Sequence, residues 1–188
     1  MFILNICNNQ TIKNIHAAAI INSEIAASDA SYAYTYASIM IGNRVELGEE
    51  AISKSAYWSY NYALNVLNGR FELGEEAISK HIDYAYRYVR EIINGRFELY
   101  ESIFANNAYF AYMYAKYALT NPFPLGELTI SKSDTYSYWY AFDVLKGPFP
   151  LGEPNIALSI SYSSLYTSKI LKRDFYLNDI LICKYVEE

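Results

Sequence analysis

The sequence predicts an all-α protein, organised as an α-solenoid of about six helical-hairpin repeats of 26 residues with capping ends. Three observations lead to this prediction. The chain repeats itself with a fixed period, glycine or asparagine recurs at one position of the period, and a residue that favours a helix N-terminus recurs at another. Each repeat therefore holds two helices, and helical hairpins stacked at a fixed period form a solenoid.

The repeat is clearest where residues 44–54 are compared with residues 70–80, because the two segments differ at a single position. A third copy opens at Arg96, and later copies carry Pro122 and Pro148 in place of the arginine. The register continues without an insertion, and the last part of the chain keeps the phase at Phe175, Leu177, Asp179 and Ile182. We expect a single array, 1–188, with an N-terminal cap at 1–17, repeats at 18–43, 44–69, 70–95, 96–121, 122–147 and 148–173, and a C-terminal half-repeat cap at 174–188.

The longer helix of each repeat has a predicted start and a predicted end. Its expected N-terminal position is held by Asp29, Ser55, His81, Asn107, Ser133 and Ser159, and all except the histidine are good N-caps. Its expected end is marked by Gly69, Gly95, Gly147 and Asn121, the residue types that most readily adopt the left-handed conformation after a helix. A helix of roughly 12 residues fits between the two signals.

The shorter helix is expected to begin near Gly48 and to run about two turns to Lys54. Glutamates in its first turn and lysine in its last turn match the helix dipole. The Pro-Phe-Pro segments fit an extended link before this helix. Alternation such as Tyr34-Thr-Tyr36 has the period of a β-strand, but the caps and the Ala-x-x-Val-Leu continuation favour helix.

Composition and charge exclude several classes of protein. With 53% hydrophobic residues the chain is not disordered, and a net charge of −5 with a pI of about 5.1 does not favour nucleic acid as a partner. Cys7 and Cys183 are too few for a disulfide scaffold or a zinc site, so we expect both to be buried and the compartment to be the cytoplasm. The start of the chain lacks a basic region before its short apolar run, which predicts neither a signal peptide nor a membrane segment.

Tyrosine is the most unusual feature, with 21 residues in 188. Most tyrosines fall into three columns, each at one phase of the period. Two columns lie four residues apart and, with an apolar column four residues further on, predict a continuous core stripe: Tyr32, Trp58, Tyr84, Phe110, Tyr136 and Tyr162; Tyr36, Tyr62, Tyr88, Tyr114, Tyr140 and Tyr166; Met40, Val66, Ile92, Ala118, Val144 and Ile170. The third column, on another face, either packs sideways on the next repeat or lines an exposed surface, and we favour packing: Tyr34, Tyr60, Tyr86, Tyr112 and Tyr138, with Ser164 in the last repeat.

A ladder of carboxylates occupies one phase in five repeats, at Glu49, Glu75, Glu101, Glu127 and Glu153. A catalytic pair would not be duplicated in every repeat, so the ladder is expected to be structural. Each glutamate can accept hydrogen bonds from backbone N–H groups or from a tyrosine hydroxyl of the adjacent repeat. Successive carboxylates stand too far apart to share a metal ion, and we expect no metal, cofactor or catalytic centre, because no Walker loop, His-Glu-x-x-His or Cys-x-x-Cys motif occurs.

The repeat unit, read as Tyr60-x-Tyr-Ala-x-x-Val-Leu-x-Gly-Arg-Phe-x-x-Gly-Glu-x-x-Ile78, resembles a tandem repeat found in uncharacterised proteins of bacteriophages. The resemblance covers residues 18–173, although Val89 and Tyr100 depart from the pattern in the central repeats. It implies a helical repeat architecture and a viral origin rather than an activity. A small accessory protein of a phage suggests an inhibitor of a bacterial defence complex such as CRISPR.

These observations predict a non-catalytic scaffold that binds a protein partner, a host or defence component, in the host cytoplasm. The partner is expected to contact helix positions that vary between repeats, namely Arg87, Arg90, Glu91 and Lys116. The alternative is a sponge for small ligands or nucleotides, with slots between the tyrosines of the third column. Neither a membrane nor a nucleic acid is expected as a partner, and self-association is left open.

Overall fold

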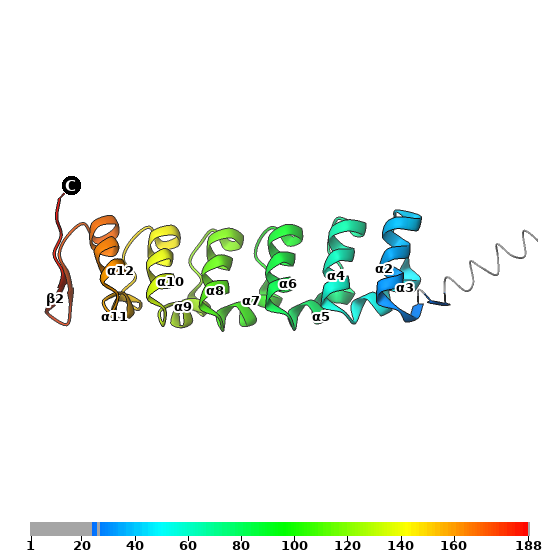
Figure 1. Cartoon of the computed structure of the whole chain (residues 1–188), viewed down its shortest axis with the longest axis horizontal. Helices are drawn as coiled ribbons and strands as arrows, with labels where there is room; N and C mark the ends of the chain where they lie inside the picture. The colour runs from blue at the N-terminus through cyan, green and yellow to red at the C-terminus, as the bar shows by residue number, and fades with distance from the viewer. Residues whose placement is uncertain (1–23, 26, 188) are drawn as a thin grey trace, which may run out of the picture. The chain divides into compact units, whose positions relative to one another are not determined.

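The computed structural model describes residues 24, 25 and 27–187, so the predicted N-terminal cap and the start of the first repeat lie outside the described residues. The chain divides into two compact units, Met1–Tyr84 and Ala85–Glu188, and the division falls within helix α6 (Ile82–Tyr88). The structure is mostly helical with one small two-stranded sheet, which confirms the helical prediction at this level (Figure 1).

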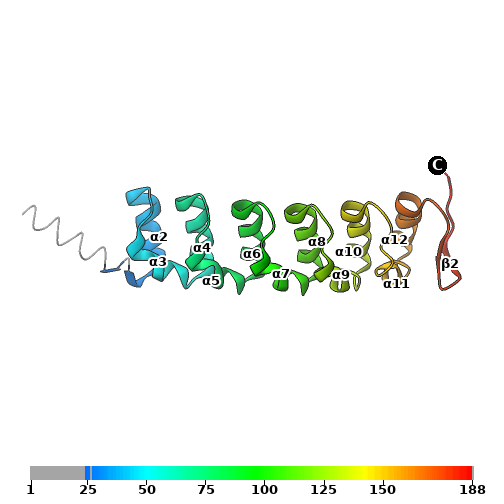
Figure 2. The same ribbon diagram turned by 180° about the vertical axis from the view of Figure 1, so that it is seen from behind.

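Within each unit, long and short helices alternate along the chain, and the same succession is visible from the opposite side (Figure 2). The elements of the first unit are α2 (Ala30–Thr35), η1 (Tyr36–Ile41), α3 (Glu46–Ser53), α4 (Ala56–Tyr62), η2 (Ala63–Leu67), η3 (Glu72–Gly74) and α5 (Glu75–Ser79). Those of the second unit are η4 (Val89–Ile93), α7 (Glu98–Ala105), α8 (Ala108–Tyr114), η5 (Ala115–Leu119), α9 (Pro124–Ile130), α10 (Asp134–Trp139), η6 (Tyr140–Leu145), α11 (Glu153–Ile156), α12 (Ile160–Leu165), η7 (Tyr166–Leu171), β1 (Phe175–Leu177) and β2 (Ile180–Cys183).

The long helices begin where the sequence predicts. In five repeats the side chain of the expected N-cap accepts a hydrogen bond from the backbone N–H three residues later, which satisfies one of the free donors of the first turn. These N-caps are Asp29, Ser55, Asn107, Ser133 and Ser159. His81 is exposed, and its ring meets the edge of Tyr84 at a centroid distance of 6.3 Å.

The predicted ends of the long helices are wrong by one residue. The left-handed conformation belongs to Asn68, Asn94, Thr120 and Lys146, with φ between 47° and 52°, and not to the residue that follows each of them. The reason is that each long helix closes in a π-helical turn (η1, η2, η4, η5, η6 and η7), which is wider than an α-turn. In the second repeat the N–H groups of Asn68 and Gly69 both donate to the carbonyl of Ala63, so the asparagine must turn left-handed before the glycine is reached.

Three short helices (α3, α7 and α9) begin two residues earlier than expected, whereas α5 and α11 begin one residue after the predicted glycine. Helix α3 starts at Glu46, two residues before the predicted start, and Lys54 is its C-cap. In the fifth repeat Pro124 is the first residue of α9 rather than part of the extended link. Proline suits this position because its fixed φ is helical and its missing N–H would have no partner in the first turn.

The tyrosines of the third column pack on the next repeat, as predicted. Each ring lies 5.1–6.1 Å from the ring of the first column in the following repeat, the distance range of aromatic pairs. The pairs are Tyr34–Trp58, Tyr60–Tyr84, Tyr86–Phe110, Tyr112–Tyr136 and Tyr138–Tyr162. The predicted stripe is not continuous, however, because Met40 at its end is 70% exposed.

The end of the chain keeps the repeat only at Phe175. This residue is 1% exposed and lies 5.4 Å from the ring of Tyr166, as Phe149 lies 5.1 Å from Tyr140. After it the chain forms the antiparallel β1–β2 hairpin, where the other repeats carry a short helix. The turn consists of Asn178 and Asp179, both with positive φ, a combination typical of two-residue hairpins. Cys183, in β2, is half-buried rather than buried.

Candidate functional site

The carboxylate ladder is held by tyrosines of the second column. Each hydroxyl donates to a glutamate 13 residues earlier, and four such bonds measure 2.8–3.1 Å: Tyr62–Glu49, Tyr114–Glu101, Tyr140–Glu127 and Tyr166–Glu153. The same hydroxyls accept a bond from the backbone N–H before the short helix, of Val45, Phe97, Phe123 and Phe149. The hydroxyl belongs to the same repeat as its glutamate, so the expected donor from an adjacent repeat is wrong.

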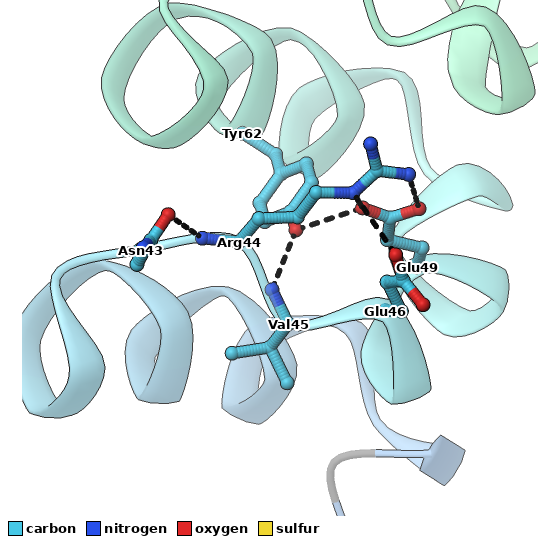
Figure 3. Close-up of polar contacts among 6 residues, drawn as sticks. All are labelled: Asn43, Arg44, Val45, Glu46, Glu49 and Tyr62. Carbon is cyan, nitrogen blue, oxygen red and sulfur yellow. Dashed lines mark hydrogen bonds and ion pairs between the residues drawn. The ribbon is translucent and has the colours of Figure 1, made fainter.

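Arginine completes the ladder in three repeats. Arg44 binds Glu49 through Nε and Nη2 at 2.7 and 3.0 Å, and Figure 3 shows that the Glu49 carboxylate is contacted both by this guanidinium and by the Tyr62 hydroxyl. Equivalent two-point contacts join Arg70 to Glu75 and Arg96 to Glu101. The arginine side chains are 49–63% exposed, whereas Glu49 and Glu75 are nearly covered. Each of these carboxylates thus joins a link, a short helix and a long helix, and in the second and third repeats it is also buried.

The tyrosines of this junction remain hydrogen-bond donors over the whole ordinary pH range. Burial raises the pKa of Tyr62 to about 12, and the neighbouring charge of Glu49 acts in the same direction. Burial likewise raises the pKa of Tyr114 to about 12. Because the folded pKa lies above the unfolded value, this contribution to stability is complete below about pH 10 and is lost as the pH rises through the folded pKa. The ladder is therefore suited to packing rather than to proton transfer near neutral pH.

The residues predicted to contact a partner lie in different surroundings. Arg87 is exposed in α6, and Arg90 and Glu91 are exposed in η4. The Arg90 guanidinium lies beside the buried hydroxyl of Tyr86, which raises the pKa of Arg90, although the two groups do not reach hydrogen-bond geometry. Lys116 is instead held inside the second unit. Its side chain takes part in packing between two long helices and is not exposed like those of the two arginines.

Lys116, Tyr112 and Asp143 form a polar cluster between the fourth and fifth repeats. The lysine Nζ lies 2.8 Å from Asp143 Oδ2 and 3.0 Å from the Tyr112 hydroxyl, and that hydroxyl donates to the same carboxylate oxygen. Burial acts to raise the pKa of Asp143, but the bonds from Lys116 and Tyr112 outweigh it and the pKa is lowered. The contact with Asp143 in turn raises the pKa of Lys116. The ion pair between Lys116 and Asp143 thus connects the long helices of two neighbouring repeats.

We expect Asp143→Asn to lower the free energy of unfolding by about 1–2 kcal/mol at pH 7, the scale of hydrogen bonds to charged groups. Because the folded pKa of Asp143 lies below the unfolded value, its contribution is present above about pH 4 and is lost as the pH falls through the folded pKa. The free energy of unfolding of both proteins is measured by urea denaturation between pH 7 and pH 2.5, in steps of about one pH unit. A difference between them that persists unchanged in acid would contradict it.

Sequence reasoning missed a row of exposed leucines. Leucine occupies one phase of five repeats, two in the first unit and three in the second, and each of these residues is 48–63% exposed. In four of the five repeats the next residue is the glycine at which the short helix becomes buried, and in the other it is Tyr100. The row consists of Leu47, Leu73, Leu99, Leu125 and Leu151. The signal was present in the repeated Leu-Gly pair, because the leucine persists where the neighbouring arginine changes to proline. Because these large apolar side chains are exposed to solvent, their recurrence is not explained by packing in the core.

Open clefts lie beside leucines of this row in both units, and one cleft in each unit is formed by the same repeat positions. The cleft in the second unit has a volume of about 480 Å³ and is lined by the Arg96–Glu101 pair and by residues 122–125. The cleft in the first unit, about 230 Å³, is lined at the same phase by the Arg44–Glu49 pair and by Phe71 and Leu73. The same repeat positions therefore produce the same kind of surface, an ion pair facing apolar side chains.

The described residues contain neither a cluster of metal ligands nor a membrane-spanning helix. No group of three or more histidine, cysteine, aspartate or glutamate side chains is placed to hold a metal ion there. Among the helices of residues 24, 25 and 27–187, none combines the length and the apolar character needed to cross a membrane. Comparison of the chain with models of protein families, with curated proteins and with solved structures finds no match.

Proposed function

We propose that the protein is a non-catalytic scaffold, an α-solenoid of six 26-residue helical hairpins, that binds a protein partner through the leucine row. The observation that carries the proposal is the recurrence of half-exposed leucines at one phase, each at the start of a short helix. Single exposed apolar side chains are common on protein surfaces and need no explanation. A repeated row of them next to clefts is typical of an interaction surface. Repeat proteins present such extended surfaces.

The ordered polar groups support a structural rather than a catalytic role. The ladder glutamates are bound by tyrosine hydroxyls, and three of them also by arginine, so their lone pairs are used in packing. The Lys116–Asp143 pair joins two repeats. Neither set contains a nucleophile next to a base, the arrangement on which covalent catalysis depends.

The sponge alternative is less favoured by the geometry. A planar ligand would need to stack on tyrosines of the third column, but each of those rings already faces a ring of the next repeat. The tyrosines of this column between Tyr60 and Tyr138 are only 3–7% exposed. Aromatic packing inside the protein thus occupies the faces that the ligand would use.

The partner class follows from the resemblance of the repeat to bacteriophage proteins and from nothing else. On that basis we place the protein in the bacterial cytoplasm and its partner among host or defence proteins, CRISPR complexes included. Two surfaces compete for this partner: the leucine row on the short helices, and the exposed Arg87, Arg90 and Glu91 on α6 and η4.

The test is capture of partners from a bacterial lysate at modest salt, followed by mass spectrometry of the protein and small-molecule fractions. Three proteins are compared: the unaltered chain, a variant with Leu99→Gln, Leu125→Gln and Leu151→Gln, and a charge-reversed Arg87→Glu, Arg90→Glu control. We expect both variants to keep the melting temperature, since all five side chains are exposed. The amount of captured partner should be at least tenfold lower with the leucine variant than with the unaltered chain, and unchanged with the charge-reversed control.

Loss with the charge-reversed variant alone would move the interface to α6 and η4. Enrichment of a small molecule without any protein would favour the sponge. If the unaltered chain captures neither, the scaffold proposal is wrong.

A further inference from the structure

Glu127 differs from the first three members of the ladder in its outer partner. Its Oε1 accepts the 2.8 Å bond from the Tyr140 hydroxyl, as the other glutamates do from their tyrosines. The residue five positions earlier is Pro122, where the equivalent repeats have the arginine that binds the carboxylate. Within the described residues no ion pair and no second hydrogen bond reaches the side-chain carboxylate of Glu127, and the residue is half-buried, where Glu49 and Glu75 are nearly covered.

Around Tyr140, among residues 24, 25 and 27–187, no other cation stands in the place of the arginine. Burial raises the pKa of Tyr62 and of Tyr114, and the charges of Arg44 and Arg96 oppose the rise. Burial raises the pKa of Tyr140 as well, and Glu127 adds to it, but no basic group acts on this hydroxyl. The last repeat also has proline at this position, yet Arg173 stands near enough to act on Tyr166. Glu127 thus has the same position and the same tyrosine partner as the glutamates that bind arginine in other repeats, but it has no arginine partner.

The surface next to Glu127 has changed in the same repeat. Helix α9 carries Leu125 and Leu128, which are 59% and 63% exposed and lie three residues apart on one face. Glu50 and Glu76 occupy the phase of Leu128 in the second and third repeats and pair there with a lysine. The fourth repeat keeps the arginine but already has Ser102 at this phase. The fifth repeat lacks both the arginine and the surface glutamate, so that its ladder carboxylate lies beside an apolar face.

We propose that Glu127 receives the guanidinium of an arginine from the protein partner, with apolar side chains of the same partner segment seated on Leu125 and Leu128. The other repeats show the geometry: two parallel N–H···O contacts on the outer side of the carboxylate while tyrosine holds the inner side. Guanidinium fits this arrangement better than ammonium because it offers two donors in one plane. A single half-exposed pair is weak by itself, so the leucines must supply part of the affinity. This inference rests on the proposed scaffold function.

The experiment uses the full chain labelled with ¹³C at the glutamate carboxyl groups and titrates it with N-acetyl-arginine amide, a minimal guanidinium probe. We expect the resonance of Glu127 to move and saturate, while that of Glu75, already bound by Arg70, stays in place. N-acetyl-lysine amide should bind at least threefold more weakly. The highly exposed Glu98 reports non-specific pairing.

Pro122→Arg is the decisive variant, because it returns the arginine to this repeat and fills the site from within. Its folded chain should show the Glu127 resonance already shifted and unresponsive to the probe. Glu127→Gln, in which the amide oxygen can still accept the Tyr140 bond, should also remove the response and controls for assignment. A Glu127 shift no larger than that of Glu98, equal binding of the lysine probe, or a response that survives in Pro122→Arg would overturn the inference.

The same variant separates this inference from the scaffold proposal. If a partner captured from lysate binds Pro122→Arg as well as the unaltered chain, the scaffold stands and the arginine contact is wrong. If the probe binds Glu127 but no partner is captured, the carboxylate is a guanidinium site and the scaffold proposal is the one that fails.

Discussion

Gly74→Ala is expected to lower the free energy of unfolding by about 3 kcal/mol, the upper part of the range for forcing an atom into a filled core. A Cβ at this position would lie 2.5 Å from the Cβ of Ser59 and 2.6 Å from the Phe71 ring, much closer than van der Waals contact. The serine cannot move aside easily, because its hydroxyl donates a 2.9 Å bond to the carbonyl of Ile52 at the end of α3. The short helix would have to shift away from α4.

Gly95→Ala is the matched control. Nothing lies within 4 Å of a Cβ there and φ is not positive, so we expect a change within about 0.5 kcal/mol, or a small gain from the stiffer unfolded chain. Urea denaturation of the two variants and the parent gives the comparison. Equal losses in both would show that close approach of the short helix is not the reason for glycine at position 74.

The fourth repeat carries Tyr100 at the phase of Gly74, and its surroundings differ as well. Tyr100 is fully buried and its ring meets Phe97 and Phe104 at 4.7 and 6.4 Å. Phe104 stands at the phase of Ile78, and Ala85 at that of Ser59, so several core positions differ together. A lone alanine at position 74 has no such compensation.

Tyr112→Ala is expected to cost about 3–4 kcal/mol, as truncation of a large buried side chain does. The ring is 7% exposed and stacks on Tyr136 of the next repeat at 6.1 Å. Its hydroxyl binds Asp143, so the truncation also leaves that carboxylate with Lys116 alone. Loss of an aromatic contact and loss of a hydrogen bond to a charged group therefore add.

Tyr176→Ala is the control for this prediction, since Tyr176 is 50% exposed in β1 and should change the free energy of unfolding by less than about 1 kcal/mol. Both variants are compared by denaturation followed through circular dichroism. A Tyr112 variant as stable as the Tyr176 variant would mean that the third column faces solvent and serves binding instead of packing.

The sequence predicted those parts of the structure that depend on local chemistry. Side-chain caps act over three residues, so serine or aspartate at a fixed phase located the helix starts. The helix ends were misplaced because a π-turn depends on how the whole helix packs, and neither Asn68 nor Lys146 signals one by its residue type. Lys116 looked like a variable surface residue because its partner, Asp143, lies 27 positions away in the chain.

The leucine row was overlooked for a different reason. A leucine at helical spacing reads as a core residue, and only the backbone direction shows that Leu73 faces outward while its neighbour Gly74 faces inward. The importance of Pro122 likewise became visible only when the arginines were seen on the ladder. The effect of a substitution such as arginine to proline can be recognised only by comparison with the repeats that keep the arginine.

The β1–β2 hairpin follows the last long helix, in the part of the chain where earlier repeats carry a short helix. A run of similar repeats exposes, at its last helix, the surface on which one more repeat would sit, and a second chain could join there to start a filament. In α12 the tyrosine that would receive it is replaced by the exposed Ser164, and Phe175 already covers Tyr166 before the chain turns into the hairpin. We therefore expect the hairpin, which packs on α12, to oppose the stacking of a second copy on this helix.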